Sequence, residues 1–252
     1  MRDELFYKKR HVLGYIARHG ANHYFDEVIG SSDDFVAGFE LEVSLNKYCS
    51  EVPAKKILYI SKHSLPSFCF AKHDCTIGAG IEIVSLPIGY NEIMKNKEIE
   101  TMCRKLQHYK MRNIQSESTK TGLHIHVGNK EFKDDAHRFN IIEFIKRNAI
   151  YIYKLSKRRY VHGYGGLSAY TDLNMIRNTD LSSIGRNGNI NPMTSKYDTF
   201  EYRMFCGIPK ISYIRACYDF VKICTEINRD RVRSWIDFLY EARQYNYIWR
   251  LL

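Results

Sequence analysis

The sequence predicts an α+β fold in which helices cover one face of a mainly antiparallel sheet. Four segments alternate apolar and polar residues with a period of two, which is typical of strands buried on one side. Longer segments between and after them repeat apolar residues at helical spacing. At 252 residues, 44% of them hydrophobic, the chain is long enough to bury a substantial core. This order of strands, helices and closing helices indicates a single α+β domain.

The strands are expected at 36–45 (VAGFELEVSL), 80–88 (GIEIVSLPI), 121–128 (TGLHIHVG) and 199–208 (TFEYRMFCGI). In the first of them, Phe39, Leu41 and Val43 alternate with polar residues, and Pro87 ends the second. The run 55–61 (KKILYIS) is too short to distinguish a helix from a strand by its pattern.

Helices are expected at 1–20, 90–111, 134–158, 210–228 and 229–248. Asp134 or Asp135 supplies the N-cap region of the third helix. The segment 161–198 is rich in glycine and asparagine, and a loop of this length inside a domain is usually functional or disordered. We divide the chain into an N-terminal helix-and-loop extension, residues 1–35, and a main domain, residues 36–252.

The composition limits the classes of function. A net charge of +10 favours anionic partners, nucleic acid among them, although the basic residues are spread along the chain. No run approaches the ~18 apolar residues of a membrane span, and the N-terminus MRDELFYKKRHVLGY has no apolar signal core. The seven cysteines form no CxxC pair. We therefore expect reduced thiols, a cytoplasmic location and no membrane partner.

The polar faces of the four predicted strands carry an unusual set of side chains. They are Glu40, Glu42, Glu82, His124, His126, Glu201 and Arg203, with Asp74 shortly before the second strand. For any one strand, a solvated sheet face is the simpler explanation. A merely solvated face, however, favours lysines, threonines and pairs of opposite charge over four carboxylates and two imidazoles.

Carboxylates gather in this way where divalent cations neutralise them. Oxygen ligands with only one or two imidazoles suit Mg²⁺ or Mn²⁺ better than Zn²⁺. An arginine beside such a cluster indicates a phosphate that the metals also hold.

Four motifs in this order resemble the amidoligases, a branch of the carboxylate–amine ligases that share the fold of glutamine synthetase and glutamate–cysteine ligase. They are GFELE, DCT followed by IEIVSLP, TGLHIHVG and FEYRMF, and the match runs from about residue 36 to 225. The resemblance implies a glutamine synthetase-like catalytic domain over residues 36–252, built on a curved antiparallel sheet. It also implies an ATP-dependent ligase that forms an amide bond through an acyl phosphate, with ATP and two or three divalent metals (Mg²⁺ or Mn²⁺) on the polar face. The chain has no P-loop motif, in keeping with this fold.

The resemblance assigns roles by position. The metal that bridges the ATP phosphates would be held by Glu40, His124 and Glu201. A metal at the acyl-phosphate side would be held by Glu42, Asp74 and Glu82. Arg203 would stabilise the transferring phosphoryl group, and His126 would lie near the nucleotide. Arg203, Glu42 and Asp74 are thus the expected catalytic residues.

Two regions depart from the family or align poorly with it. The family often has Asp-Gly-Ser where this chain has Asp74, Cys75 and Thr76. The segment 161–198 is variable in the family, and we interpret it as a lid that protects an acyl phosphate from water. Cations in or near this segment are candidates for contact with ATP or the acid substrate, although each is also explained as a solvated surface cation. They are Arg158, Arg159, Arg177, Arg186 and Lys196, of which we include Arg186 and Lys196 in the nucleotide site.

Two alternatives remain open. A histidine–apolar–histidine strand is also the metal motif of rolling-circle (HUH-type) endonucleases, whose downstream helix carries a tyrosine nucleophile with a lysine three residues later. Tyr151 and Lys154 match that spacing. The other alternative is a catalytically inactive ligase fold that binds nucleic acid. For the ligase, the substrates would be small-molecule or peptide carboxylates and amines, with an anionic acceptor favoured by the charge.

Overall fold

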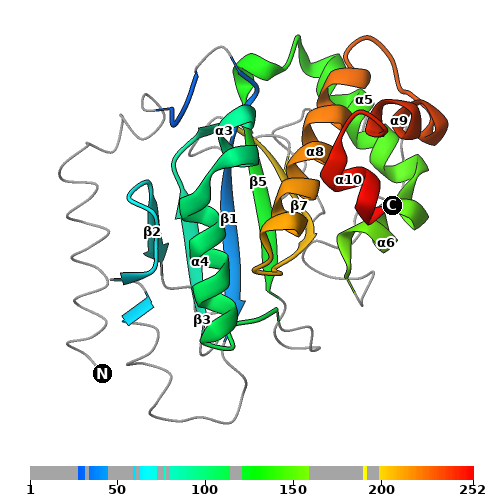
Figure 1. The fold of residues 1–252 in the computed structure, drawn as a ribbon. Helices are drawn as coiled ribbons and strands as arrows, with labels where there is room; N and C mark the ends of the chain where they lie inside the picture. Colours follow the sequence, from blue (N-terminus) through cyan, green and yellow to red (C-terminus); the bar gives the residue numbers. More distant parts are fainter. Residues whose placement is uncertain are drawn as a thin grey trace. The chain divides into compact units, whose positions relative to one another are not determined.

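The computed structural model describes residues 28–31, 34–44, 59–60, 63–72, 77, 80–113, 121–158, 190–191 and 199–252. The chain forms two compact units. The first unit comprises Met1–Gly122 with Gly207–Ile211, and the second comprises Leu123–Cys206 with Ser212–Leu252. Each unit combines strands with helices (Figure 1). The predicted α+β class is therefore confirmed, while the glutamine synthetase-like architecture stays a prediction.

The strands of the first unit form an antiparallel arrangement around β1 (Val36–Ser44). One side of β1 pairs with β3 (Gly80–Ser85), and β3 pairs in turn with β2 (Cys69–Lys72). The start of β1 pairs with β4 (Ile88–Gly89). The strand predicted over 80–88 is thus two strands, interrupted at Leu86 and Pro87 because proline cannot donate to a ladder.

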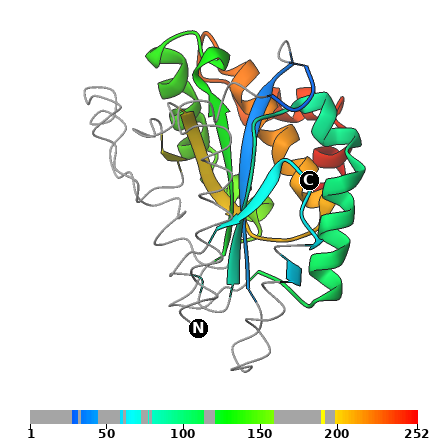
Figure 2. The same ribbon diagram turned by 90° about the vertical axis from the view of Figure 1, so that its left-hand side faces the viewer.

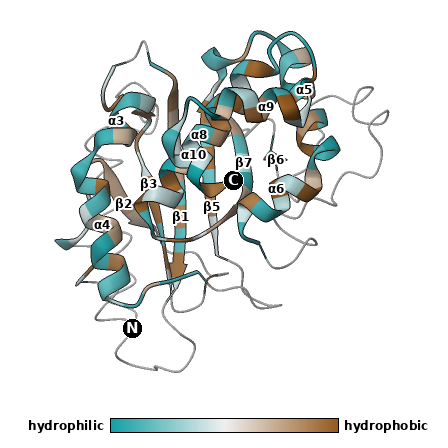
Figure 3. Ribbon diagram, turned by 45° about the vertical axis from the view of Figure 1, so that its right-hand side comes forward, coloured by the Kyte–Doolittle hydropathy of each residue, from teal (hydrophilic) through white to brown (hydrophobic). Residues whose placement is uncertain are grey.

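The helices of the first unit are α3 (Tyr90–Lys95) and α4 (Lys97–His108). A single helix was expected over 90–111, but Asn96 separates the two. Its side chain accepts a hydrogen bond from the backbone N–H of Ile99 at 3.0 Å, which caps the second helix. Helix α4 buries Ile99, Met102 and Leu106 and runs along one face of the strands of this unit (Figure 2). Figure 3 shows brown residues along β1 and teal residues along α4.

The second unit contains β5 from Leu123 on (Gly122–Gly128), β7 (Thr199–Cys206) and the short β6 (Ile190–Asn191). Strand β7 neighbours β5 on one side and pairs with β6, antiparallel, on the other. The strands predicted at 121–128 and 199–208 are confirmed. Strand β6 was not predicted, because it lies inside the glycine-rich segment.

The apolar face of β7 packs on helices of the second unit. The hydroxyls of Tyr202 and Thr225 lie 3.0 Å apart, which joins β7 to α8 (Ile211–Ile227). The ring centroids of Phe132 and Phe200 lie 5.1 Å apart. Because successive residues of a strand point to opposite faces, this packing leaves the intervening Glu201 and Arg203 on the other face.

The helix predicted over 134–158 is two helices, α5 (Asp135–Arg147) and α6 (Ala149–Ser156). Asp134 is the N-cap of α5, as expected, and accepts from the backbone N–H of His137 at 2.8 Å. The helices separate at Asn148, whose side-chain amide donates to the carbonyl of Phe144 at 2.8 Å. Before α5 stands a short 3₁₀ turn, η1 (Asn129–Glu131).

His137 fixes the start of α5 to the end of α8. It is buried, its Nδ1 accepts from the N–H of Lys133 at 3.2 Å, and its Nε2 lies 2.6 Å from the carbonyl oxygen of Thr225. Since Nδ1 is an acceptor here, Nε2 carries the proton and donates. Burial lowers the pKa of His137 below its ordinary value.

The closing helices are α8, α9 (Trp235–Ala242) and α10 (Asn246–Leu251). The predicted helix 210–228 is confirmed as α8, whereas the predicted helix 229–248 is two shorter ones. Ser234 starts α9 with a capping box formed with Asp237, so the chain before it is not helical. Among the described helices, none is long and apolar enough to cross a bilayer.

Several predictions fall on other parts of the chain. The helix over 1–20 and most of the segment 161–198 lie outside the described residues. Within the run 55–61, Tyr59 and Ile60 are described and are helical.

Candidate metal-binding site

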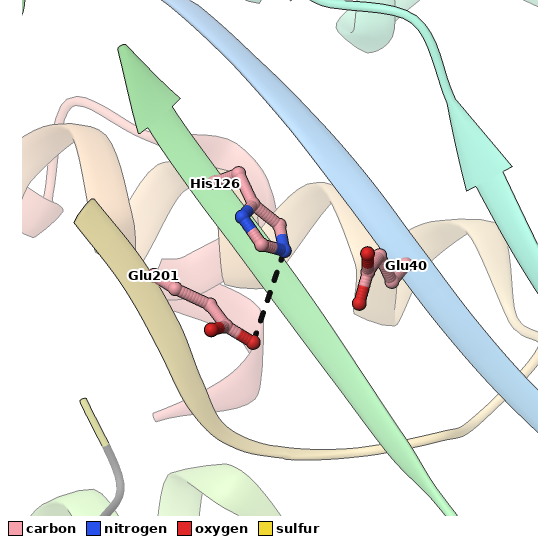
Figure 4. A group of neighbouring side chains, drawn as sticks. All are labelled: Glu40, His126 and Glu201. Carbon is pink, nitrogen blue, oxygen red and sulfur yellow. Dashed lines mark ion pairs between the residues drawn. The ribbon is translucent and has the colours of Figure 1, made fainter. Parts of the chain in front are cut away.

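Glu201 is the centre of a cluster on the polar face of β5 and β7. Its side chain is 3% exposed. One carboxylate oxygen, Oε1, accepts a hydrogen bond from Nη1 of Arg203 at 2.6 Å. The same oxygen lies 3.3 Å from Nδ1 of His124 and 3.8 Å from Nε2 of His126. Figure 4 shows the His126 ring turned toward Glu201, and it also draws Glu40 of β1.

Two further polar residues hold this cluster. The side-chain amide of Asn191 donates to Oε2 of Glu201 at 3.2 Å, so both carboxylate oxygens are engaged. Nδ1 of His126 lies 3.2 Å from Oγ1 of Thr199. Sequence reasoning missed both residues. Thr199 alternates with Glu201, which was a usable signal, but a threonine on a polar strand face is ordinary. Asn191 offered no periodic signal.

Arg203 retains donor capacity beyond its bond to Glu201. Its side chain is 18% exposed, and its buried Nε has no hydrogen-bond partner among the residues that the structure describes. A guanidinium has five N–H donors in a planar fork that matches phosphate and carboxylate oxygens. Arg203 is therefore suited to hold an anion beside Glu201.

Arg158 was a candidate for contact with ATP, but its side chain hydrogen-bonds the backbone of β7. It is buried and donates from Nε to the carbonyl of Met204 and from Nη2 to the carbonyl of Arg203, both at 3.2 Å. These bonds fix the end of α6 to the strand that carries Glu201.

The first unit contains a second group of carboxylates. Glu42 of β1 and Glu82 of β3 are directly opposite each other in the antiparallel register, and their residues are 8% and 3% exposed. Residues so paired share a face, with Cβ atoms about 5 Å apart. Oε2 of Glu42 accepts from the backbone N–H of Gly122 at 2.6 Å. Glu40 precedes Glu42 by two residues and is half-buried on the same face.

Like charges directly opposite each other destabilise a sheet. A divalent cation removes this conflict because it favours both ionised carboxylates. The Glu42–Glu82 pair is therefore suited to share a cation.

The backbone at Gly207 packs tightly against the backbone of Glu42 and Gly122. A Cβ atom at this position would overlap the carbonyl oxygen of Glu42 and lie 2.9 Å from that of Gly122. The N–H of Gly207 donates to the carbonyl of Thr121 at 3.1 Å. Gly207 is thus required for close approach of backbones next to the Glu42 carboxylate.

The structure assigns the predicted site residues to the two units as follows. Glu40, Glu42 and Glu82 belong to the first unit, whereas His124, His126, Glu201 and Arg203 belong to the second. Asp74, Arg159, Arg177, Arg186 and Lys196 lie outside the described residues. Tyr151, the nucleophile of the endonuclease alternative, is 47% exposed on α6, with its ring stacked on Trp235 at 5.0 Å between centroids.

Comparisons with known proteins do not assign the chain to a protein family. No family model matches it, and a search of curated proteins finds no match either.

Proposed function

We propose that the protein is an ATP-dependent amidoligase, a carboxylate–amine ligase that forms an amide bond through an acyl-phosphate intermediate. The observation that carries this proposal is the Glu201 cluster, in which a buried carboxylate is set between two imidazoles and a guanidinium with spare donors. A metal ligand beside a phosphate-binding arginine is what the F-E-Y-R motif implies for this family. The motif order along the chain supports the same conclusion.

The donors fit Mg²⁺ or Mn²⁺. The Glu201 group offers carboxylate oxygens and imidazole nitrogens, and the Glu42–Glu82 pair offers carboxylate oxygens. Neither group contains a thiolate, which disfavours softer metals. One ion would use Glu201 with an imidazole, and a second would use Glu42 with Glu82. Glu40 and Asp74 enter the proposal through their motifs, GFELE and DCT. Bound divalent cations would supply Lewis-acid polarisation of the phosphates and neutralise their charge.

The residues of the chain would divide the work of phosphoryl transfer. Arg203 would donate to the oxygens of the transferring phosphoryl group, and its bond to Glu201 would hold the guanidinium beside the site until the phosphate binds. His126, the more exposed imidazole, would lie on the nucleotide side together with Arg186 and Lys196. Burial of the ligands limits access of water, which would otherwise hydrolyse an acyl phosphate.

The proposal identifies the two substrates only by their chemical class. The acid and the amine would be small metabolites or peptides, and the net charge of +10 favours an anionic acceptor, which includes nucleic acid. The cysteine pattern supports a cytoplasmic location.

The test is release of phosphate from ATP in the presence of Mg²⁺, together with calorimetric binding of ATP. Arg203→Ala is expected to lower turnover by about 10³-fold, because it removes a positioned cation at the phosphoryl group. Glu42→Ala is expected to abolish turnover. Tyr151→Phe and the surface control Arg147→Ala are expected to leave it unchanged.

Two outcomes would replace the proposal. Nicking of DNA without ATP, lost in Tyr151→Phe, would identify an endonuclease. Absence of ATP binding in the presence of Mg²⁺, combined with retention of DNA or RNA that weakens steeply with salt, would identify a nucleic-acid-binding protein.

A further inference from the structure

Asn191 fixes the rotation of the Glu201 carboxylate. The two residues are directly opposite each other in the β6–β7 register, so their side chains share a face. Asn191 is 3% exposed, and its amide donates to Oε2 of Glu201. With Oε2 held there, the other oxygen, Oε1, faces Arg203 and the two histidines.

Thr199 orients the His126 ring through a hydrogen bond, as Asn191 orients the Glu201 carboxylate. It lies two residues before Glu201 in β7, on the same face, and it is buried. Its Oγ1 lies 3.2 Å from Nδ1 of His126, while Nε2 of the same ring lies 3.8 Å from Oε1 of Glu201. Threonine is branched at Cβ and has few χ1 choices, so the position of its hydroxyl is well defined.

We propose that Asn191 and Thr199 are positioning residues that select Oε1 of Glu201 and Nε2 of His126 as the atoms that bind a divalent cation. This inference rests on the proposed function, since it refers to the same cation. It makes His126 a metal ligand and gives His124, whose Nδ1 lies 3.3 Å from Oε1, the role of orienting the carboxylate.

The selection works through the tautomer of His126. A ring whose Nδ1–H donates to a fixed oxygen presents an unprotonated Nε2, which is the form that binds metals. In this proposal Thr199 Oγ1 is such an oxygen, and it accepts from Nδ1–H across the 3.2 Å contact. Groups that orient metal ligands in this way typically change metal affinity by about 10–100-fold when they are removed.

The first experiment measures Mn²⁺ binding by electron paramagnetic resonance of the free ion. Thr199→Val and Asn191→Leu preserve side-chain size and remove the polar contact, so each is expected to raise the Kd for Mn²⁺ about 10–100-fold. Thr199→Ser, which keeps the hydroxyl, is expected to restore most of the affinity. Thr101→Val on α4 is the matched control and is expected to bind Mn²⁺ as the unaltered protein does.

The second experiment reads the tautomer without metal. Long-range proton–nitrogen NMR of ¹⁵N-histidine-labelled protein at pH 8 is expected to show His126 protonated at Nδ1, and Thr199→Val is expected to lose this preference. A purely structural role of Thr199 would leave the tautomer unchanged.

The outcomes separate the two claims. If the unaltered protein binds no Mn²⁺, the proposed function fails, and the inference fails with it. If it binds Mn²⁺ but Thr199→Val and Thr199→Ser bind equally tightly, the inference alone is overturned. The inference is also overturned if His126 of the metal-free protein is protonated at Nε2. This measurement uses the unaltered protein alone, so it does not depend on whether a variant folds.

Discussion

The two units place buried carboxylates beside different neighbours. In the second unit, Glu201 is paired with Arg203 and flanked by two imidazoles. In the first unit, Glu42 and Glu82 oppose each other across a strand pair, and Glu42 also accepts from a backbone N–H. Burial of a paired charge is tolerable, whereas burial of two like charges favours an added cation. The comparison teaches that similar polar strand faces can place a buried carboxylate beside a guanidinium or beside another carboxylate.

The largest expected effect is on folding stability in the second unit. Glu201→Gln leaves Arg203 without its counter-charge and is expected to lower the free energy of unfolding by about 3 kcal/mol. Urea unfolding measures this loss. Glu143→Gln is the matched control: Glu143 is also buried, but its partner Arg147 is exposed, so its loss is expected to be below about 1 kcal/mol. Equal losses in both variants would show that Arg203 does not depend on Glu201.

A second prediction concerns the backbone next to Glu42. Gly207→Ala forces the chain away from the Glu42 carbonyl and is expected to lower the free energy of unfolding by about 2 kcal/mol, as overpacked sites do. Gly128→Ala is the control, since a Cβ there meets nothing within 4 Å. A Gly207→Ala variant as stable as its parent would contradict the tight packing.

In the first unit, removal of a carboxylate is expected to have the opposite sign. Glu42→Gln keeps an oxygen for the N–H of Gly122 but relieves the repulsion from Glu82, so stability without metal is expected to stay equal or to rise by up to about 1 kcal/mol. Thermal unfolding with and without Mg²⁺ measures both the stability of the metal-free protein and the stabilisation that Mg²⁺ adds. Stabilisation by added Mg²⁺ is expected to shrink in Glu42→Gln. A loss of several kcal/mol in the absence of metal would show that the pair is stabilised within the protein, as Glu201 is.

The smallest effect concerns His137, a buried histidine outside the site. Its pKa is lowered in the folded protein, whereas in the unfolded chain it titrates near ~6.5. The unfolded state therefore binds the proton more readily, and the stability due to neutral His137 is complete above pH ~6.5 and decreases as the pH falls toward the folded pKa. Urea unfolding between pH 7.5 and 5 in steps of about half a unit checks this. His137→Gln is expected to flatten the slope, and an unchanged slope would contradict it.

The strands could be predicted because each one follows a simple rule. Phe39, Leu41 and Val43 alternate with polar residues, and so do Leu123, Ile125 and Val127, and the structure buries both sets. The same alternation identified the polar faces that carry Glu42 and Glu201. It did not predict the register that opposes Glu42 to Glu82, because register depends on pairing between distant segments.

The helix breaks and the supporting residues could not be predicted for a different reason. Apolar spacing continues through Asn96 and Asn148, and each break depends on a bond between an asparagine side chain and the backbone. Asn191 lies in a two-residue strand without any periodicity, so only its pairing with Glu201 reveals its place. Local sequence patterns predict which face of a strand or helix is buried, whereas the hydrogen-bond partner of a side chain depends on contacts between distant segments.

The bond between Arg203 and Glu201 has a consequence for the order of binding. Under the proposed function, a divalent cation that reaches Oε1 competes with a guanidinium already held there at 2.6 Å. Its affinity is therefore a difference between two attractions and is lower while the arginine stays. A nucleotide phosphate that draws Arg203 away removes the competitor, so nucleotide and metal strengthen each other's binding by the same factor, as linkage requires. The site would then hold its metal more tightly when the nucleotide is bound than before it arrives.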